Sequence, residues 1–182
     1  LMETTERFEE VNKTIEEDSA RFSAMAGEYA KKITKHIDTA MQEAYKALND
    51  SKDTTISVAY LEKLVLNLSS LLYFVSDKVE EINIRDDVAT ATAKDAYEKA
   101  YLNACAEKDD KGKSIRTVAE NQSIASQSSK EEEILATIYD RASKIVRSKV
   151  EAGNEMVATI RKIITLRIKQ MEQEDAVDRS DS

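Results

Sequence analysis

Residues 8–48, FEEVNKTIEEDSARFSAMAGEYAKKITKHIDTAMQEAYKAL, decide the fold because their apolar side chains recur in steps of three and four. This spacing places the following side chains on one face of an α-helix: Phe8, Val11, Ile15, Phe22, Met25, Tyr29, Ile33, Ile37, Ala40, Ala44 and Leu48. The one weak point of the series is Asp18. The pattern predicts a single helix over residues 3–48, which at 1.5 Å per residue is about 70 Å long.

Residues 49–53, NDSKD, break this period and predict a turn, after which a second helix is predicted over residues 55–106. The first half of this helix, residues 56–75, carries more apolar side chains than one face can hold. Its second half carries alanines at helical spacing: Ala89, Ala93, Ala96, Ala100 and Ala104. Small side chains let neighbouring helices approach closely, so we expect a thick first half and a slim second half.

Residues 107–113 are charged, include Gly112 and predict a second turn, and a third helix is predicted over residues 115–172. The polar, serine-rich stretch 122–133 is expected to kink or break it, and the acidic residues 175–182 are expected to form a flexible tail. Long helices joined by short turns must alternate in direction. The predicted fold is therefore all-α, an elongated antiparallel three-helix bundle that forms one domain over residues 1–174.

The composition agrees with long helices, because the 182 residues include no proline and no tryptophan, only three glycines, and 34% charged residues. The formal net charge of -8 argues against a protein whose whole surface meets nucleic acid. Cys105 is the only cysteine, and we expect it to be a small buried residue. The first residues contain neither the cationic nor the apolar segment of a signal peptide.

No reaction, cofactor or metal is predicted. The only histidine, His36, follows Ile33 at the spacing where a ferritin-like di-iron site needs glutamate. A calcium loop beginning at Asp109 would need glycine where Ser114 stands. The chain has no glycine-rich phosphate loop and no Gly-x-Ser-x-Gly motif. We therefore expect a non-enzymatic protein with no catalytic residue, no cofactor, no metal and no small-molecule substrate.

Charge and apolar surplus coincide at one end of the predicted bundle. Residues 1–20 hold seven acids and two bases, whereas residues 140–169 hold eight bases and three acids. In an antiparallel bundle this basic segment lies beside the apolar residues 56–75. We predict a surface there that binds a protein partner or a second copy, formed by Lys32, Tyr60, Leu64, Arg161 and Arg167.

A structural or recognition rod is the favoured function, and two alternatives use the same end. The first is a cytoplasmic or phage-encoded coiled-coil protein that binds nucleic acid or a protein through its basic end, although exposed aromatic residues are not interleaved with the bases. The second is a helical component that inserts into membranes through residues 56–75. Glu62, Lys63 and Asn67 interrupt that stretch and make spanning costly.

Long helices rich in alanine and glutamate, the alanine series 89–104, the absence of proline and several N-x-Ser/Thr sequons resemble the elongated surface proteins of trypanosomes. The resemblance is to the glutamic acid/alanine-rich protein and, more distantly, to the N-terminal domains of variant surface glycoproteins, whose paired cysteines this chain lacks. It implies a coat protein at the cell surface, attached to the membrane only through an anchor outside this sequence. The candidate glycosylation sites are Asn12, Asn49 and Asn121, whereas Asn67 lies in an apolar helix where a glycan fits badly.

Overall fold

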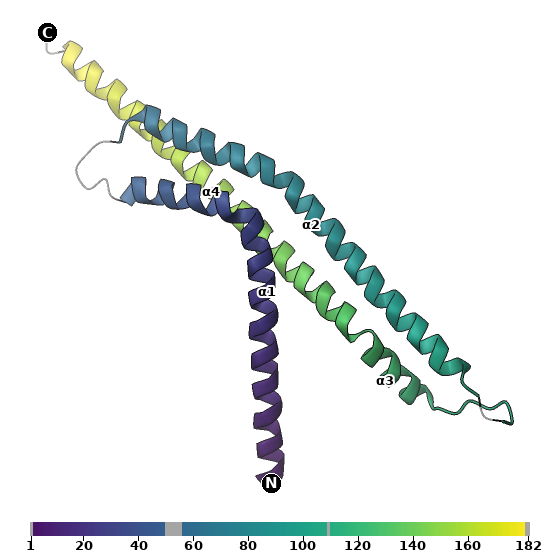
Figure 1. Cartoon of the computed structure of the whole chain (residues 1–182). Helices are drawn as coiled ribbons and strands as arrows, with labels where there is room; N and C mark the ends of the chain where they lie inside the picture. Colours follow the sequence, from purple (N-terminus) through teal and green to yellow (C-terminus); the bar gives the residue numbers. More distant parts are fainter. Residues whose placement is uncertain (1, 50–55, 109, 181–182) are drawn as a thin grey trace. The chain divides into compact units, whose positions relative to one another are not determined.

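The computed structural model describes the backbone of residues 2–49, 56–108 and 110–180, and the side chains of residues 12–49, 56–108, 110–173 and 176 (Figure 1). Four helices account for most of it: α1 (Met2–Asn49), α2 (Val58–Ala106), α3 (Val118–Ser128) and α4 (Lys130–Ser180). The described residues contain no strand, and their one β-bridge is an isolated pair between Lys108 and Ser114. The prediction of an all-α chain is therefore confirmed.

The helix bounds agree with the sequence pattern at most points. The predicted third helix is divided into α3 and α4 at Ser129, inside the polar stretch where a break was expected. The predicted flexible tail was wrong as far as Ser180, because α4 continues to that residue. A helix that is already formed extends by one hydrogen bond per added residue, without needing an apolar face. Residues 50–55, which include most of the first predicted turn, lie outside the described part.

The described chain divides into two compact units where the sequence predicted one bundle. Unit 1 consists of residues 1–30 and 80–144, and unit 2 consists of residues 31–79 and 145–182. Each of α1, α2 and α4 therefore contributes one part to each unit.

The core of unit 2 is built from Ala44 of α1, Leu61 and Leu64 of α2, and Ile160 of α4, all at most 7% exposed. Here α2 and α4 run antiparallel, because Arg167 Nη1 donates a hydrogen bond to the carbonyl oxygen of Ile56 at one end. Farther along, Gly153 of α4 contacts Leu72 of α2. On α1, Asp38 accepts hydrogen bonds from Thr34 Oγ1 at 3.0 Å and from Lys149 Nζ at 2.6 Å.

The core of unit 1 consists largely of small side chains: Ala26, Ala30, Ile82, Ala89, Ala93, Ala104, Ala125, Ile138 and Ala142 are buried. Ser143 Oγ donates to Asn83 Oδ1 at 2.9 Å, and Asn121 Nδ2 donates to Cys105 Sγ at 3.3 Å. These two pairs show that α2 runs antiparallel to α3 and α4. The rings of Tyr29 and Tyr139 meet edge to face with centroids 5.4 Å apart, and this contact joins α1 to α4.

The start of α3 is fixed by a capping box. The backbone N–H of Thr117 donates to Glu120 Oε2 at 2.7 Å, and the backbone N–H of Glu120 donates to Thr117 Oγ1 at 3.3 Å. These bonds satisfy backbone donors that a helix leaves free at its first turn, so the helix begins here. The bond from the Thr117 backbone N–H, and then that from its hydroxyl, lower the pKa of Glu120 below its ordinary value of 4.5.

Candidate binding surface on α2 and α4

An apolar surface lies on the outer side of α2 in unit 2. Leu66, Tyr73 and Phe74 are 69%, 74% and 68% exposed, although the opposite side of the same helix is buried in the core. Steps of seven and eight residues place all three on one helix face, and the rings of Tyr73 and Phe74 meet edge to face at 5.7 Å. We call Leu66, Tyr73 and Phe74 the α2 patch.

A groove of about 490 Å³ adjoins this patch between α2 and α4. It is lined by Glu62, Val65, Leu66 and Ser69 from α2, and by Arg161, Ile164 and Thr165 from α4. Leu66 belongs to both the patch and the groove, so the apolar surface continues into a cavity that has a guanidinium group in its wall. Such a surface can receive an apolar side chain and a carboxylate side by side.

The structure separates the five residues that were predicted to bind a partner. Arg161 lines the groove, and Lys32 and Tyr60 are exposed outside its lining. Leu64 is 7% exposed and belongs to the core of unit 2, so the prediction of a surface role for it was wrong. Arg167 is half-buried and bonded to Ile56, which gives it a structural role.

The α2 patch itself was not among the predicted site residues. The sequence showed that residues 56–75 hold too many apolar side chains for one face, which was the available signal. It could not show which face α4 covers, because two apolar stripes on one helix are equivalent until a neighbouring helix packs on one of them.

The three candidate glycosylation sites also differ. Asn12 and Asn49 are exposed, and Asn12 Nδ2 donates to Glu16 Oε1 at 3.0 Å. Asn121 is 3% exposed and is bonded to Cys105, so a glycan does not fit there and that prediction was wrong.

Cys105 is half-buried and free, not fully buried as expected, and a hydrogen bond with its side chain raises the pKa of Tyr101.

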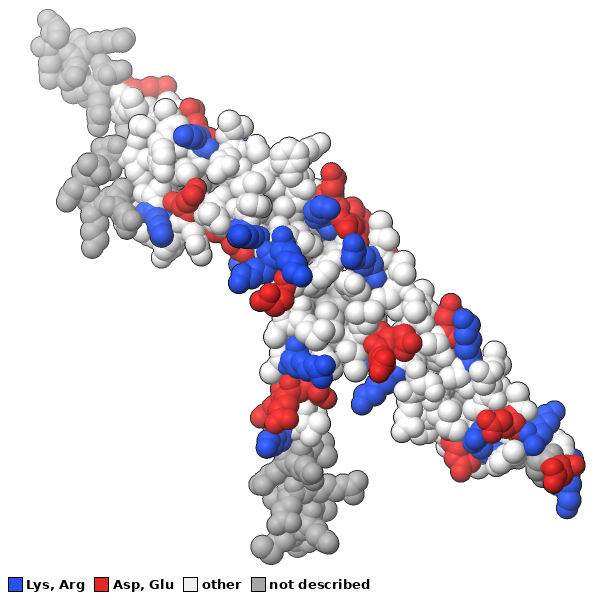
Figure 2. Space-filling view, viewed as in Figure 1, with Lys and Arg blue, Asp and Glu red and all other residues white. Residues whose placement is uncertain are grey.

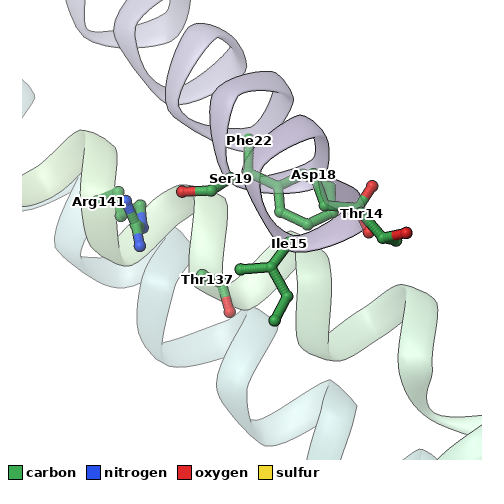
Figure 3. A pocket seen from close by; sticks show the side chains of 7 residues that line it. All are labelled: Thr14, Ile15, Asp18, Ser19, Phe22, Thr137 and Arg141. Carbon is green, nitrogen blue, oxygen red and sulfur yellow. The ribbon is translucent and has the colours of Figure 1, made fainter. Parts of the chain in front are cut away.

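A second cavity, of about 590 Å³, lies in unit 1 between α1 and α4 (Figure 3). Its wall consists of Thr14, Ile15, Asp18, Ser19 and Phe22 from α1, and Thr137 and Arg141 from α4. Three hydroxyl groups line it, but no histidine or lysine accompanies them in this lining to act as a base. In the part of the chain with described side chains, no group of three or more His, Cys, Asp or Glu residues could hold a metal ion.

Charge is divided unequally between the units. The segments of unit 2 contain 14 Lys or Arg and 13 Asp or Glu, whereas those of unit 1 contain 13 and 22. Unit 1 therefore has a net charge of -9, whereas unit 2 is close to neutral. Figure 2 shows basic and acidic side chains interspersed on the visible face, with broad areas between them that carry no charge.

Within the described residues, one helix is long and apolar enough to cross a membrane by length and composition alone. This helix is α2, in which an 18-residue window reaches a mean hydropathy of 1.4 and is 28% buried. The core helix of a soluble protein meets the same criterion.

Comparison of the sequence with protein-family models found no match, and comparisons with curated proteins and with solved structures found none either.

Proposed function

We propose that this chain is a non-enzymatic recognition protein, built as an elongated antiparallel three-helix rod, which binds a protein partner through the α2 patch and the adjoining groove. The observation that carries the proposal is the exposure of Leu66, Tyr73 and Phe74, of which Leu66 lines the groove together with Arg161. Contiguous exposed apolar patches on soluble proteins mark interaction sites, and aromatic residues and arginine contribute most of the binding energy at such sites. The lengths of α1, α2 and α4, which are 48, 49 and 51 residues, support the rod.

The chemistry of the surface indicates the partner. A protein segment that offers an apolar side chain to the α2 patch and a carboxylate to Arg161 is complementary to both parts. Unit 1, with its excess of acids, repels an acidic partner, whereas unit 2 is close to neutral and does not. An acidic partner is therefore directed to unit 2.

A cell-surface location suits this function. The sequons at Asn12 and Asn49 are on exposed side chains and are accessible to glycosylation. A coat protein of the kind that the sequence resembles would present its helices to other proteins in the same way. The proposal for α2 and α4 does not depend on this location.

Membrane insertion through α2 is the competing function, and the apolar window in that helix favours it. Against it, α2 supplies Leu61, Leu64, Leu68 and Leu72 to the core of unit 2. Inserting α2 into a bilayer would remove these side chains from their packing and would also bury the charges of Glu62 and Lys63 in lipid, which is costly.

Photo-crosslinking in the cells that express the protein tests the proposal. Benzoylphenylalanine is placed at Tyr73 in the patch and, as a control, at Lys99, an exposed position of α2 outside the patch. We expect one defined protein adduct at position 73 and none at position 99, and a lower yield when Arg161→Glu is added. Adducts to lipid or nucleic acid at position 73, or equal yields at the two positions, would contradict the proposal.

A further inference from the structure

A different part of the molecule, the N-terminal portion of α1 in unit 1, is largely exposed to solvent. Every residue from Asn12 to Arg21 is exposed, and Ile15 is 60% exposed. The segment meets α4 at the wall of the cavity near Thr137 and Arg141, and Arg141 Nη1 donates to Ser23 Oγ at 3.3 Å. A helical segment that buries so little of its surface is only marginally stable in water. The segment is therefore expected to pack against another surface for part of the time.

The order of its side chains indicates what kind of surface it meets. Ile15, Asp18, Phe22 and Met25 follow one another in steps of three, four and three, and we call these four residues the α1 seam. The acids Glu16 and Glu17 lie on the outer faces, whereas the positions beside the seam are Asn12, Thr14, Ser19 and Arg21. A seam with few charges beside it and acids facing away is typical of a helix that packs against other helices.

Unit 1 also contains an open groove of about 270 Å³ between α2 and α4. Its apolar walls include Ile84 and Val88 of α2 and Leu135 of α4, which are 60%, 59% and 47% exposed. Glu132 also lines it, and Glu132 Oε2 is buried without a hydrogen-bond partner. A buried carboxylate oxygen in this state needs a donor.

The contact between Tyr29 and Tyr139 sets the register in which the seam and groove would meet. Because consecutive long helices alternate in direction, α1 and α4 run the same way, and both rise 1.5 Å per residue. Seven residues before the tyrosine pair, Phe22 therefore falls opposite Glu132. Four residues before it, Met25 falls opposite Leu135.

The same register agrees with two further features. Arg85 of α2 lies 6.0 Å from the ring centre of Tyr29, so in the antiparallel direction Met25 falls opposite Ala89, which also lines the groove. Asp18, the one polar residue of the seam, falls opposite Ser128, next to the break between α3 and α4. In this register Met25 meets Leu135 and Ala89, Asp18 meets a polar site, and Phe22 lies beside Glu132.

We propose that residues 12–25 of α1 form a strap that closes onto the groove between α2 and α4 of the same chain. In the closed state Met25 covers Leu135 and Val88, and the guanidinium of Arg21 donates to the unpartnered oxygen of Glu132. In the open state, Ile15, Asp18 and Phe22 of the seam line the cavity beside Thr137 and Arg141, and the groove is exposed. Unit 1 therefore has a two-state element whose closure depends on one ion pair.

Disulfide trapping tests this closure. Ser19→Cys on the strap and Ser128→Cys at the end of α3 are combined with Cys105→Ser, which keeps an acceptor for Asn121. In the open structure Ser19 lines the cavity beside Thr137, nine residues along the chain from Ser128. A disulfide requires Cα atoms within about 7 Å, so only the closed state can form it.

We expect an intramolecular disulfide in the monomer under mild oxidation. Arg21→Glu should slow its formation about fivefold, and adding Glu132→Arg to this variant should restore the rate. Lys13→Glu, on the outer face of the same strap, is the matched control and should leave the rate unchanged. Circular dichroism of each variant checks that helicity is retained. Disulfide-linked dimers alone, no disulfide, or a rate that does not respond to Arg21→Glu would each overturn the proposal.

Discussion

Gly153 of α4 lies so close to Leu72 of α2 that a β-carbon added to the glycine would be 2.8 Å from Leu72 Cδ2. Leu72 is 5% exposed, so its side chain has little room to move away. Glycine inside a helix lowers helix stability, and here the close packing of the two helices in unit 2 accounts for its presence.

Substituting the two helical glycines should therefore have opposite effects. Gly153→Val forces the β-carbon and two methyl groups against Leu72 and should destabilise the protein by about 1–3 kcal/mol. A β-carbon at Gly27 meets nothing within 4 Å, so Gly27→Ala should stabilise by about 0.5–1 kcal/mol through helix propensity alone. Urea unfolding of the two variants measures both changes, and equal shifts of the midpoint would contradict the packing of α4 on α2.

Leu64 should behave as a core residue. Leu64→Ala removes a side chain that packs with Leu61, Ala44 and Ile160, and should cost about 2–5 kcal/mol in the free energy of unfolding. Lys63→Ala, at the exposed neighbouring position, is the control and should change it by less than about 0.5 kcal/mol. A loss of less than about 1 kcal/mol for Leu64→Ala would show that the side chain of Leu64 is not packed in the core.

Arg167 should hold the start of α2 in place. Its guanidinium donates to the carbonyl oxygen of Ile56, just before the first helical turn. Arg167→Met should therefore accelerate hydrogen exchange at the amides of Tyr60 and Leu61, which bond to the carbonyl of Ser57. Arg161→Met, in the groove wall, should not change these rates. Equal acceleration in both variants would show that the bond to Ile56 is unimportant.

The cap of α3 predicts a pH dependence. The pKa of Glu120 is lowered by its bonds to Thr117, so the carboxylate stabilises the folded state above its unfolded pKa. That contribution is lost as the pH falls below about 4.5 and through the lower folded value. Glu120→Gln should remove this part of the acid sensitivity, and Thr117→Ala should cost about 0.5–2 kcal/mol at neutral pH. Unfolding curves of wild type and both variants between pH 3 and pH 7 measure these effects. If the free energy of unfolding of Glu120→Gln depended on pH as that of the wild type does, the carboxylate of Glu120 would not stabilise the start of α3.

Periodicity was enough to predict the helices, because steps of three and four are a property of the local chain. The break near Ser129 was also predictable, since serine-rich polar residues offer no apolar face to maintain the helix there. The end of α4 was missed because a helix that is already formed can continue without apolar spacing.

The binding surface could be predicted only in part. Arg161 was found because basic residues cluster in the sequence of α4. Leu64 was chosen and Leu66 was not, although the two differ only in the face of α2 on which they lie. That choice depends on where α4 packs, and packing between helices far apart in sequence cannot be deduced from the spacing within one of them.

The central claim is that the exposed apolar residues of α2 serve a partner and not the core of this chain. The most direct test is the free energy of unfolding of the triple variant Leu66→Gln, Tyr73→Gln and Phe74→Gln, measured in urea at two protein concentrations. Because glutamine is a good helix former and the three side chains are exposed, each substitution should change the free energy of unfolding by less than about 0.5 kcal/mol. A loss of more than about 2 kcal/mol per substitution at both concentrations would show that the chain buries these residues itself, and would contradict the claim.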